Sequence, residues 1–256
     1  MIPAERQQRI LSLIKENNGV LSINDLVRLL NVSHMTIRRD LQLLEQNKLV
    51  ESVTGGVRLP NQLIHDLSVQ IKENFAPEEK DRIGERAASY VQDGQCIYLD
   101  EGTTSLALAH HITDRKNLTV VTNDFDIVRF LSNNSSANII HIGGEVRRDT
   151  RSSVGIFAYR TLSYLNMDYA FLSCSSWDLR GITTPDSDKV LVKQAAMDSS
   201  MHKVLICDSS KYNKVAVYRV SELTKLTEMI TDVGLPDEAK SALVNLGIKL
   251  TLVENS

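Results

Sequence analysis

A helical stretch that runs directly into a glycine-punctuated hairpin constrains this chain more than any other feature. The segment TIRRDLQLLEQNKLVESVTGGVRL occupies residues 36–59. Its first half has apolar residues at helical spacing, which leaves Arg38 and Arg39 outside the apolar stripe. Its second half alternates around Gly55-Gly56, which predicts a two-residue β-hairpin. The segment is therefore either a surface that reads DNA or a solvated helix followed by a turn.

Two more helices are predicted upstream of this segment. The first is expected over residues 3–18, because Pro3 suits a first turn and Gly19 a left-handed C-cap. Ser22 and Ser33 are predicted N-caps of the second and third helices. The short loop between those two helices predicts a helix-turn-helix, whose second helix enters the major groove of DNA. A hairpin after that helix would form a wing along the DNA backbone.

The charge distribution agrees in sign with a small DNA-facing module on an acidic domain. Residues 1–60 hold eight Lys and Arg against six Asp and Glu, a net charge of +2. The remaining residues hold 21 against 26, a net charge of −5. Any amphipathic helix exposes charged residues. The charge alone therefore does not distinguish a DNA-binding helix-turn-helix from one that binds no DNA. The three helices, the two caps and the hairpin together favour DNA binding.

The stretch VSHMTIRRDLQLLEQNKLVESVTGGVRL resembles the signature of the DeoR family of bacterial transcription regulators. The resemblance covers residues 1–59 and implies a winged helix-turn-helix domain. It also implies that Gly55 and Gly56 shape the wing. We further expect Asp40 to be structural and to orient an arginine. Gln42 is added as a contact from the same helix and Arg58 as a phosphate contact on the wing. The residues expected to contact DNA are Ser33, Thr36, Arg38, Arg39, Gln42 and Arg58.

The rest of the chain predicts an α/β domain. Residues 60–78 contain two prolines and are expected to form a connector with some helix. From Glu79 onward, short apolar strands alternate with helices, which predicts a mainly parallel sheet covered on both faces. The predicted division is a winged helix-turn-helix over 1–59, a linker over 60–78 and a larger α/β sensor domain over 79–256.

Three successive predicted strands end in polar residues or glycines. The first is followed by Gly102 and two threonines at the start of a helix. Glycine allows close approach of the backbone, and threonine hydroxyls with helix N-terminal N–H groups favour an anion. Because the carboxyl ends of parallel strands share one edge of a sheet, the three ends predict one pocket. An ordinary capped helix start explains any single one of them equally well.

Several short stretches of this half, including DEGTT, VVTN, HIGGEV, VKQAAM and CDSSKY, resemble the effector domain of the same family. That domain is similar to the fold of ribose-5-phosphate isomerases and binds phosphorylated sugars. Lys211 is a further candidate contact. The stretch LSCSSWD stands where the family is richer in glycine, so Ser173, Cys174 and Trp177 would set the ligand specificity, with packing in a loop as the favoured alternative for Trp177. Glu101 stands where the family has a small residue, so it would either repel a phosphate or hydrogen-bond sugar hydroxyls. The implied ligand-binding residues are Asp100, Gly102, Thr103, Thr104, Thr122, Asn123, Gly143, Gly144 and Lys193.

The resemblance implies a sequence-specific DNA-binding repressor of a carbohydrate catabolism operon, controlled by a phosphorylated sugar. Reading a palindromic operator requires two copies of the helix, so a homo-oligomer, dimer or tetramer, is expected. The alternative is a sugar-phosphate isomerase-like enzyme with a DNA-binding appendage. No catalysis is expected, because the lysine, glycine run and glutamate of those isomerases have no counterpart here.

No cofactor and no metal are expected, since the three cysteines lie far apart and the six histidines form no ligand motif. The polar N-terminus and the absence of a long apolar run favour a cytoplasmic protein without a membrane partner.

Overall fold

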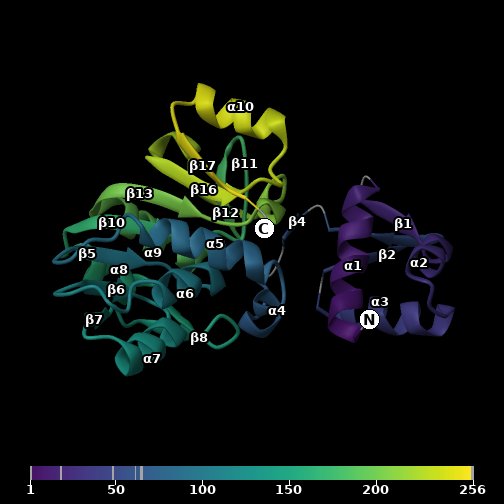
Figure 1. Ribbon diagram of the computed structural model, residues 1–256, viewed down its shortest axis with the longest axis horizontal. Coiled ribbons are helices and arrows are strands. Elements are labelled where there is room, and N and C mark those ends of the chain that lie inside the picture. Colours follow the sequence, from purple (N-terminus) through teal and green to yellow (C-terminus); the bar gives the residue numbers. More distant parts are fainter. Residues whose placement is uncertain (1, 18, 48, 61, 64–65, 255–256) are drawn as a thin grey trace. The chain divides into compact units, whose positions relative to one another are not determined.

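The chain forms two compact units, Met1–His65 and Asp66–Ser256 (Figure 1). The computed structural model describes residues 2–17, 19–47, 49–60, 62–63 and 66–254. Within this described part, no helix combines the length and the apolar character needed to cross a membrane.

The first unit is built from three helices and a small antiparallel sheet. Its helices are α1 (Pro3–Glu16), α2 (Ile23–Leu30) and α3 (His34–Gln46), and its strands are β1 (Val20–Ser22), β2 (Glu51–Val53), β3 (Gly56–Arg58) and β4 (Gln62–Leu63). The hydroxyls of Ser22 and Ser33 accept N–H groups of the first turns of α2 and α3, as predicted. Ile10, Leu26 and Ile37 meet in a fully buried core, so the apolar stripes of all three helices face one another.

The wing differs from the prediction in two respects. The turn lies at Thr54-Gly55, whereas Gly56 is already the first residue of β3. In addition, β3 lies between β1 and β2, and β1 was not predicted. A Cβ on Gly56 would come within 2.5 Å of the Leu21 carbonyl oxygen, so this glycine permits the third strand. The predicted first helix extended to Asn18, which lies outside the described residues.

The second unit contains a seven-stranded sheet in which every neighbouring pair is parallel. The mainly parallel sheet predicted from the sequence is therefore confirmed. In spatial order its strands are β17 (Lys249–Val253), β16 (Glu228–Asp232), β13 (Ser200–Ile206), β10 (Met167–Leu172), β5 (Cys96–Leu99), β6 (Thr119–Thr122) and β7 (Asn138–His141).

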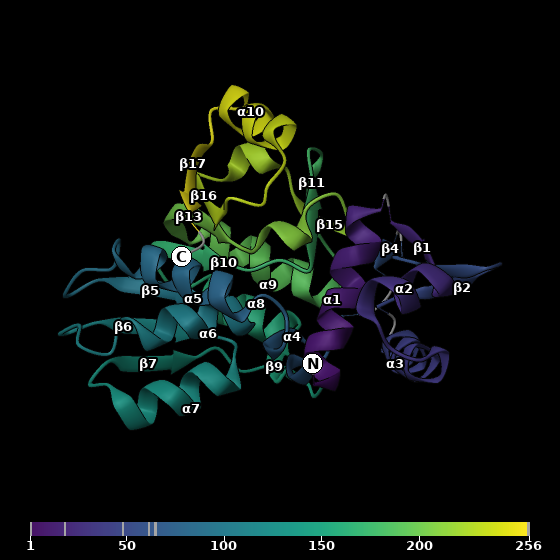
Figure 2. The ribbon, with the colours of Figure 1, turned by 45° about the vertical axis from the view of Figure 1, so that its right-hand side comes forward.

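Helices cover both faces of this sheet (Figure 2). They are α4 (Val69–Glu73), α5 (Pro77–Ala88), α6 (Thr103–His110), α7 (Phe125–Asn134), α8 (Ile156–Leu162), α9 (Ser187–Asp198), α10 (Asp237–Asn245) and the short 3₁₀ turns η1 (Ser209–Lys211) and η2 (Leu223–Lys225). Ile97 and Leu99 pack with α5, α6 and α7, whereas Tyr98 between them packs with α8, α9 and α10. The alternation along β5 thus sends successive side chains into two separate cores.

Shorter strands complete the second unit. They are β8 (Glu145–Arg147), β9 (Ser152–Val154), β11 (Ser176–Asp178), β12 (Gly181–Thr184), β14 (Val215–Ala216) and β15 (Tyr218–Ser221). The antiparallel sheet β11-β12-β15 and the hairpin β8-β9 were not predicted. Trp177 is fully buried, as expected of a packing residue, but it lies on β11 and not in the expected loop. The predicted linker contains α4, and α5 begins at Pro77, two residues before the predicted start of the domain.

The strand order identifies the place where a ligand would bind. From β5 the chain proceeds through α6, β6 and α7 to β7 on one side of the sheet, whereas β10 lies on the other side of β5. The order of the strands reverses between β5 and β10. In open α/β sheets, ligands bind outside the carboxyl ends of the strands at such a reversal.

Candidate DNA-binding surface and effector pocket

The first turns of α3 present two unpaired arginines. Arg38, Arg39 and Gln42 are exposed on this helix, while Ile37 and Leu41 are buried beneath them. Within the part of the chain that the structure describes, neither arginine makes an ion pair or a hydrogen bond. Guanidinium groups held on a rigid helix and free of internal partners suit bidentate contacts to guanine or to phosphate.

Unlike the two arginines, Ser33, Thr36 and Asp40 have partners inside the first unit. The Ser33 and Thr36 hydroxyls lie 2.9 Å apart, and Ser33 also caps the helix. The Asp40 carboxylate is buried and accepts from the Arg6 guanidinium Nε at 2.5 Å, which ties α3 to α1. The structural role expected for Asp40 is confirmed, and the arginine that it holds belongs to α1.

Arg58 on the wing is already paired. Its guanidinium donates to the Glu51 carboxylate across the β2–β3 ladder at 2.8 Å, and both side chains are about half exposed. Such an exposed pair is worth at most about 1 kcal/mol, so it leaves the arginine available to a stronger anion.

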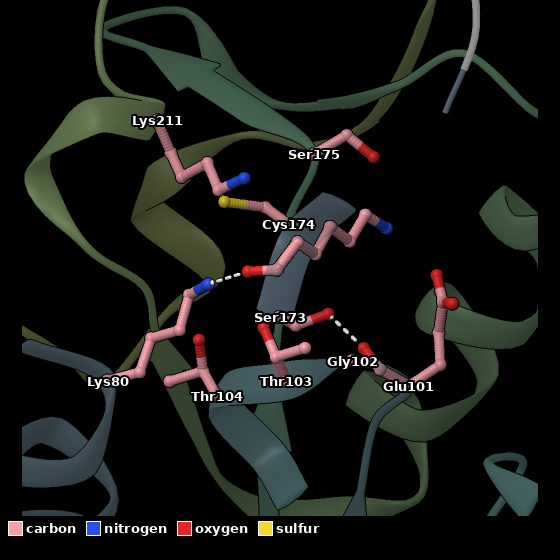
Figure 3. Close-up of a pocket in the computed structure, with 10 residues that line it drawn as sticks. Lys80, Glu101, Gly102, Thr103, Thr104, Ser173, Cys174, Ser175 and Lys211 are labelled. Carbon is pink, nitrogen blue, oxygen red and sulfur yellow. Dashed lines mark hydrogen bonds between the residues drawn. The ribbon is translucent and has the colours of Figure 1, made fainter. Parts of the chain in front are cut away.

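A pocket of the second unit lies at the carboxyl ends of β5 and β10, where the strand order reverses. Lys80 of α5, Glu101 and Thr103 at the junction of β5 and α6, and Ser173 after β10 contribute to it (Figure 3). The complete lining is Lys72, Lys80, Glu101, Gly102, Thr103, Thr104, Ser173, Cys174, Ser175 and Lys211. The ammonium groups of Lys80 and Lys211 and the N-terminus of α6 face it, whereas the Lys72 ammonium pairs with Asp66, so the pocket suits an anion.

Lys80 is the most deeply buried of the three lysines that line the pocket. It is 4 % exposed, and its ammonium donates to the carbonyl oxygens of Lys72 and Phe75. Burial lowers the pKa of Lys80 to about 8, with Asp208 nearby opposing the shift. Its charge is therefore present at neutral pH and is lost in mildly alkaline solution.

This titration makes anion binding depend on pH. The affinity for sulfate, which does not itself titrate in this range, should fall roughly tenfold between pH 7 and pH 9, because the charged fraction of Lys80 falls by that factor. Isothermal titration calorimetry would measure it. Lys80→Met should bind sulfate weakly at both pH values. An unchanged affinity for wild type from pH 7 to pH 9 would contradict this role for Lys80.

Asp124 is the other group that titrates near this range. Burial raises the pKa of Asp124 to about 7, and its carboxylate accepts from the Gly102 N–H at 2.9 Å. Asp124 would contribute to any pH dependence that survives in Lys80→Met.

Two of the predicted ligand residues pair with each other instead of lining the pocket. The Lys193 ammonium contacts the Asp100 carboxylate, and both side chains are buried. Asp100 also accepts from the backbone N–H of Ser173 at 2.9 Å and from the Tyr98 hydroxyl at 3.2 Å. The pair joins α9 to the ends of β5 and β10, so it holds the loops that form the pocket.

The second and third strand ends are not among the residues that line this pocket. The Thr122 hydroxyl donates to the Leu99 carbonyl, and the Asn123 amide donates to the Ser153 carbonyl. Gly143 and Gly144 both have positive φ, and a Cβ on Gly144 would come within 2.5 Å of a carbonyl oxygen. The four residues Thr122, Asn123, Gly143 and Gly144 thus shape the backbone beside the pocket. Of the predicted set, Gly102, Thr103 and Thr104 line it.

Glu101 is held in a buried network of charges. Its carboxylate accepts from the Lys189 ammonium at 2.6 Å, and Lys189 also donates to Asp66 at 2.6 Å and to the Thr150 hydroxyl at 3.2 Å. Lys72 pairs with the other oxygen of Asp66 at 2.7 Å. Burial raises the pKa of Glu101, but the ammonium groups of Lys189, Lys72 and Lys193 together outweigh burial, and the pKa is lowered. Glu101 is therefore ionised, and the positive charge of Lys189 compensates its negative charge. This removes the repulsion of a phosphate that the sequence left open.

Sequence reasoning missed Lys72, Lys80 and Lys189 as members of this site. Lys72 lies in the predicted linker, and Lys80 lies in a predicted helix from which no site residue was selected. Lys189 is four residues before Lys193 on α9, so both project from the same helix face. Two lysines four residues apart, with apolar residues between them on the same helix, are the sequence signal that could have identified Lys189.

Comparisons with known proteins agree over nearly the whole chain. A model of the DeoR-like helix-turn-helix domain matches residues 6–63, and a model of the DeoR C-terminal sensor domain matches residues 76–233. The helix-turn-helix transcriptional regulator YgbI of Escherichia coli K12 is 49 % identical over 255 residues, which cover 100 % of both chains. The glycerol-3-phosphate regulon repressor of the same organism is 30 % identical over 257 residues, covering 98 % of this chain and all of the other. A ribose 5-phosphate isomerase structure from Plasmodium falciparum covers 53 % of this chain and 52 % of its own, with 15 % identity and a TM-score of 0.39.

Proposed function

Since the chain belongs to the DeoR family of transcriptional regulators, we propose that it represses a carbohydrate catabolism operon and responds to a phosphorylated sugar or polyol. The observation that carries this proposal is the pocket at the reversal of the strand order, where Lys80, Lys211 and the N-terminus of α6 face one cavity. A phosphate is the anion that this combination favours. We also propose that the protein acts in the cytoplasm, where its DNA is.

For DNA binding we assign the first unit, with residues 1–59 as the winged helix-turn-helix. Arg38 and Arg39 are the principal contacts, and Ser33, Thr36 and Gln42 lie on the same helix. Arg58 would exchange its partner Glu51 for a backbone phosphate. One copy reads one half-site, so a homo-oligomer is required for a palindromic operator.

For effector binding we assign residues 79–256 together with Lys72 from the segment 60–78. Gly102, Thr103 and Thr104 contact the ligand directly. Asp100 and Lys193 position the loops, and Thr122, Asn123, Gly143 and Gly144 support the neighbouring backbone. Linkage requires that an effector that weakens DNA binding is itself bound more weakly by the DNA complex, by the same factor.

The proposal predicts that phosphorylated sugars change the affinity for DNA. With an operator selected from random duplexes, fluorescence anisotropy should show weaker binding in the presence of one sugar or polyol phosphate, by 5- to 150-fold for a typical coupling of about 1–3 kcal/mol. The unphosphorylated parent compound is the control and should have no effect. Equal effects of the two compounds, or no sequence preference in the selected DNA, would contradict the proposal.

The alternative of an isomerase requires a carboxylate base that can reach the substrate. The candidates are Asp100, Glu101 and Glu145. Asp100 and Glu101 are each held by a buried lysine, and Glu145 is exposed and pairs with Arg147, which favours the regulatory function over this alternative. Incubation with ribose 5-phosphate tests it, since multiple turnovers to ribulose 5-phosphate would establish an enzyme.

A further inference from the structure

Helix α8 of the second unit is apolar on two opposite sides. Its inner side is formed by Ala158 and Leu162, which are fully buried. Successive residues of a helix are turned by about 100°, so four other side chains fall in one arc of about 100° nearly opposite these two. The last of the four lies in the turn that continues the helix, where the Tyr164 N–H donates to the Thr161 carbonyl at 3.3 Å. We call these four residues the α8 patch: Ile156, Phe157, Arg160 and Tyr164.

The α8 patch exposes large apolar and aromatic side chains. The exposed fractions are 49 % for Ile156, 66 % for Phe157 and 84 % for Tyr164. The fourth member, Arg160, is exposed as well, and its guanidinium makes no ion pair within the part of the chain that the structure describes. A helix that is apolar all round is normally buried on all sides, so the outer side of α8 is expected to be covered.

The outer sides of other surface helices in this unit are charged or polar. Helix α5 exposes Glu78, Asp81 and Glu85, and α10 exposes Asp237 and Glu238. These two helices therefore present to water the side chains that water solvates well, whereas α8 presents aromatic rings. The contrast shows that the composition of α8 is not explained by solvent exposure alone.

The patch is large enough for the centre of an interface between two proteins. Burial of one aromatic side chain removes about 150–250 Å² from water, so the exposed parts of Phe157 and Tyr164 correspond to roughly 225–375 Å². A stable interface buries about 800 Å² on each partner, so these two rings alone would supply between a quarter and a half of it. Aromatic residues and arginine are also the types enriched at interface centres, where lysine and carboxylates are depleted.

A second copy of the same patch is a suitable partner. In an interface with two-fold symmetry, the same surface meets itself and must be self-complementary. The α8 patch meets this condition, because its rings offer apolar area to each other and a guanidinium can stack on an aromatic ring. Arg160 of one copy would lie on Phe157 or Tyr164 of the other, which gives the arginine the partner that it lacks within the described chain.

We propose that α8 joins two copies of this chain, by packing against α8 of the second copy across a two-fold axis. This inference rests on the proposed function in one respect, because a palindromic operator requires the two copies that α8 would join. The partner is a second identical chain, and the α8 patch lies at the centre of the contact.

Sedimentation equilibrium of the full chain at micromolar concentration tests this inference. We expect wild type to have the mass of a dimer or of a larger even multiple. Phe157→Asp should halve this mass, because two like charges would then be buried together at the axis. Tyr164→Asp should have the same effect. Val244→Asp is the matched control, since it introduces the same charge at a 61 % exposed position of α10, and it should keep the wild-type mass.

A mixture of two charge variants identifies what lies opposite α8. Phe157→Asp and Phe157→Lys should each have the halved mass alone. An equal mixture of the two should regain the wild-type mass, because opposite charges then face each other across the axis. If α8 were covered by a different protein or by the first unit of its own chain, mixing would restore nothing.

The outcomes separate this inference from the proposed function. A monomeric wild type would contradict both the homo-oligomer of the proposed function and the role of α8. If wild type associates but both aspartate variants keep its mass, or if the mixture stays dissociated, the role of α8 is wrong while the homo-oligomer stands. Phe157 and Tyr164 are exposed, so the variants should fold, and the fluorescence of the buried Trp177 would verify this.

Discussion

Replacing Lys189 with methionine should lower the free energy of unfolding of the second unit by about 3–5 kcal/mol, the usual cost of removing one partner from a buried ion pair. Lys189 is 2 % exposed and holds both Asp66 and Glu101. Methionine fills nearly the same volume without charge, so the loss comes from the stranded carboxylates. Asp66 keeps Lys72, whereas Glu101 keeps no salt-bridge partner.

Urea denaturation followed by the fluorescence of Trp177 would measure this loss. The chain has a single tryptophan, and it is fully buried in the second unit, so its emission reports on that unit. Lys240→Met is the matched control, because Lys240 pairs with the exposed Asp237 and should cost less than about 1 kcal/mol. Adding Glu101→Gln to Lys189→Met should recover part of the loss, since the stranded charge is then removed. A loss below about 1 kcal/mol for Lys189→Met would show that the network is not structural.

The difference between wild type and Lys189→Met should also depend on pH. The pKa of Glu101 is depressed in the folded wild type, so its stabilising contribution is present above its ordinary value of 4.5 and is lost as the pH falls through the lower, folded-state pKa. The pKa of Lys189 is raised, mainly by Glu101 and Asp66 against the effect of burial, so its contribution is lost only as the pH rises past 10.5. The two proteins should therefore differ most at neutral pH and least in acid.

The sequence predicted the elements of this protein better than it predicted the pocket. The helix caps at Ser22 and Ser33 and the alternation of apolar strands with helices depend on residues close together in the chain. Local sequence patterns are therefore sufficient to predict them. The two ends that form the pocket, after β5 and after β10, are about 70 residues apart, and only the strand order brings them together. Residues such as Lys80 lacked a local signal, because a lysine in an amphipathic helix is normally solvated.

The ionic partners of the predicted ligand-binding residues could not be predicted from the sequence either. Asp100 and Lys193 were both selected as ligand contacts, and the structure shows that they bond to each other. A motif identifies residues that matter to a site without saying whether they contact the ligand or hold the loops around it. For Glu101 the sequence left repulsion and hydrogen bonding open, and the contact with Lys189 decides against repulsion.

The double variant Arg38→Ala/Arg39→Ala should weaken binding to a selected operator by at least about 4 kcal/mol, or roughly 1000-fold. Each specific arginine contact is worth about 1–3 kcal/mol, and the homodimer that we propose would lose four of them at once. The two side chains are exposed and unpaired within the described part of the chain, so their removal leaves no buried charge behind. The stability of the first unit should therefore change little, which circular dichroism on heating would confirm.

The matched control is Arg129→Ala/Arg180→Ala, which removes the same charge from exposed positions of the second unit. If both double variants weakened binding equally, the effect would come from net charge and α3 would not be the recognition helix. The single variants separate the two kinds of contact in anisotropy titrations at several salt concentrations. An arginine on a phosphate should weaken all sequences alike and reduce the salt slope by about 1, whereas an arginine on a base should relax the preference at one position of the operator. Because Arg38 and Arg39 are adjacent on a helix and diverge by about 100°, we expect one of each kind.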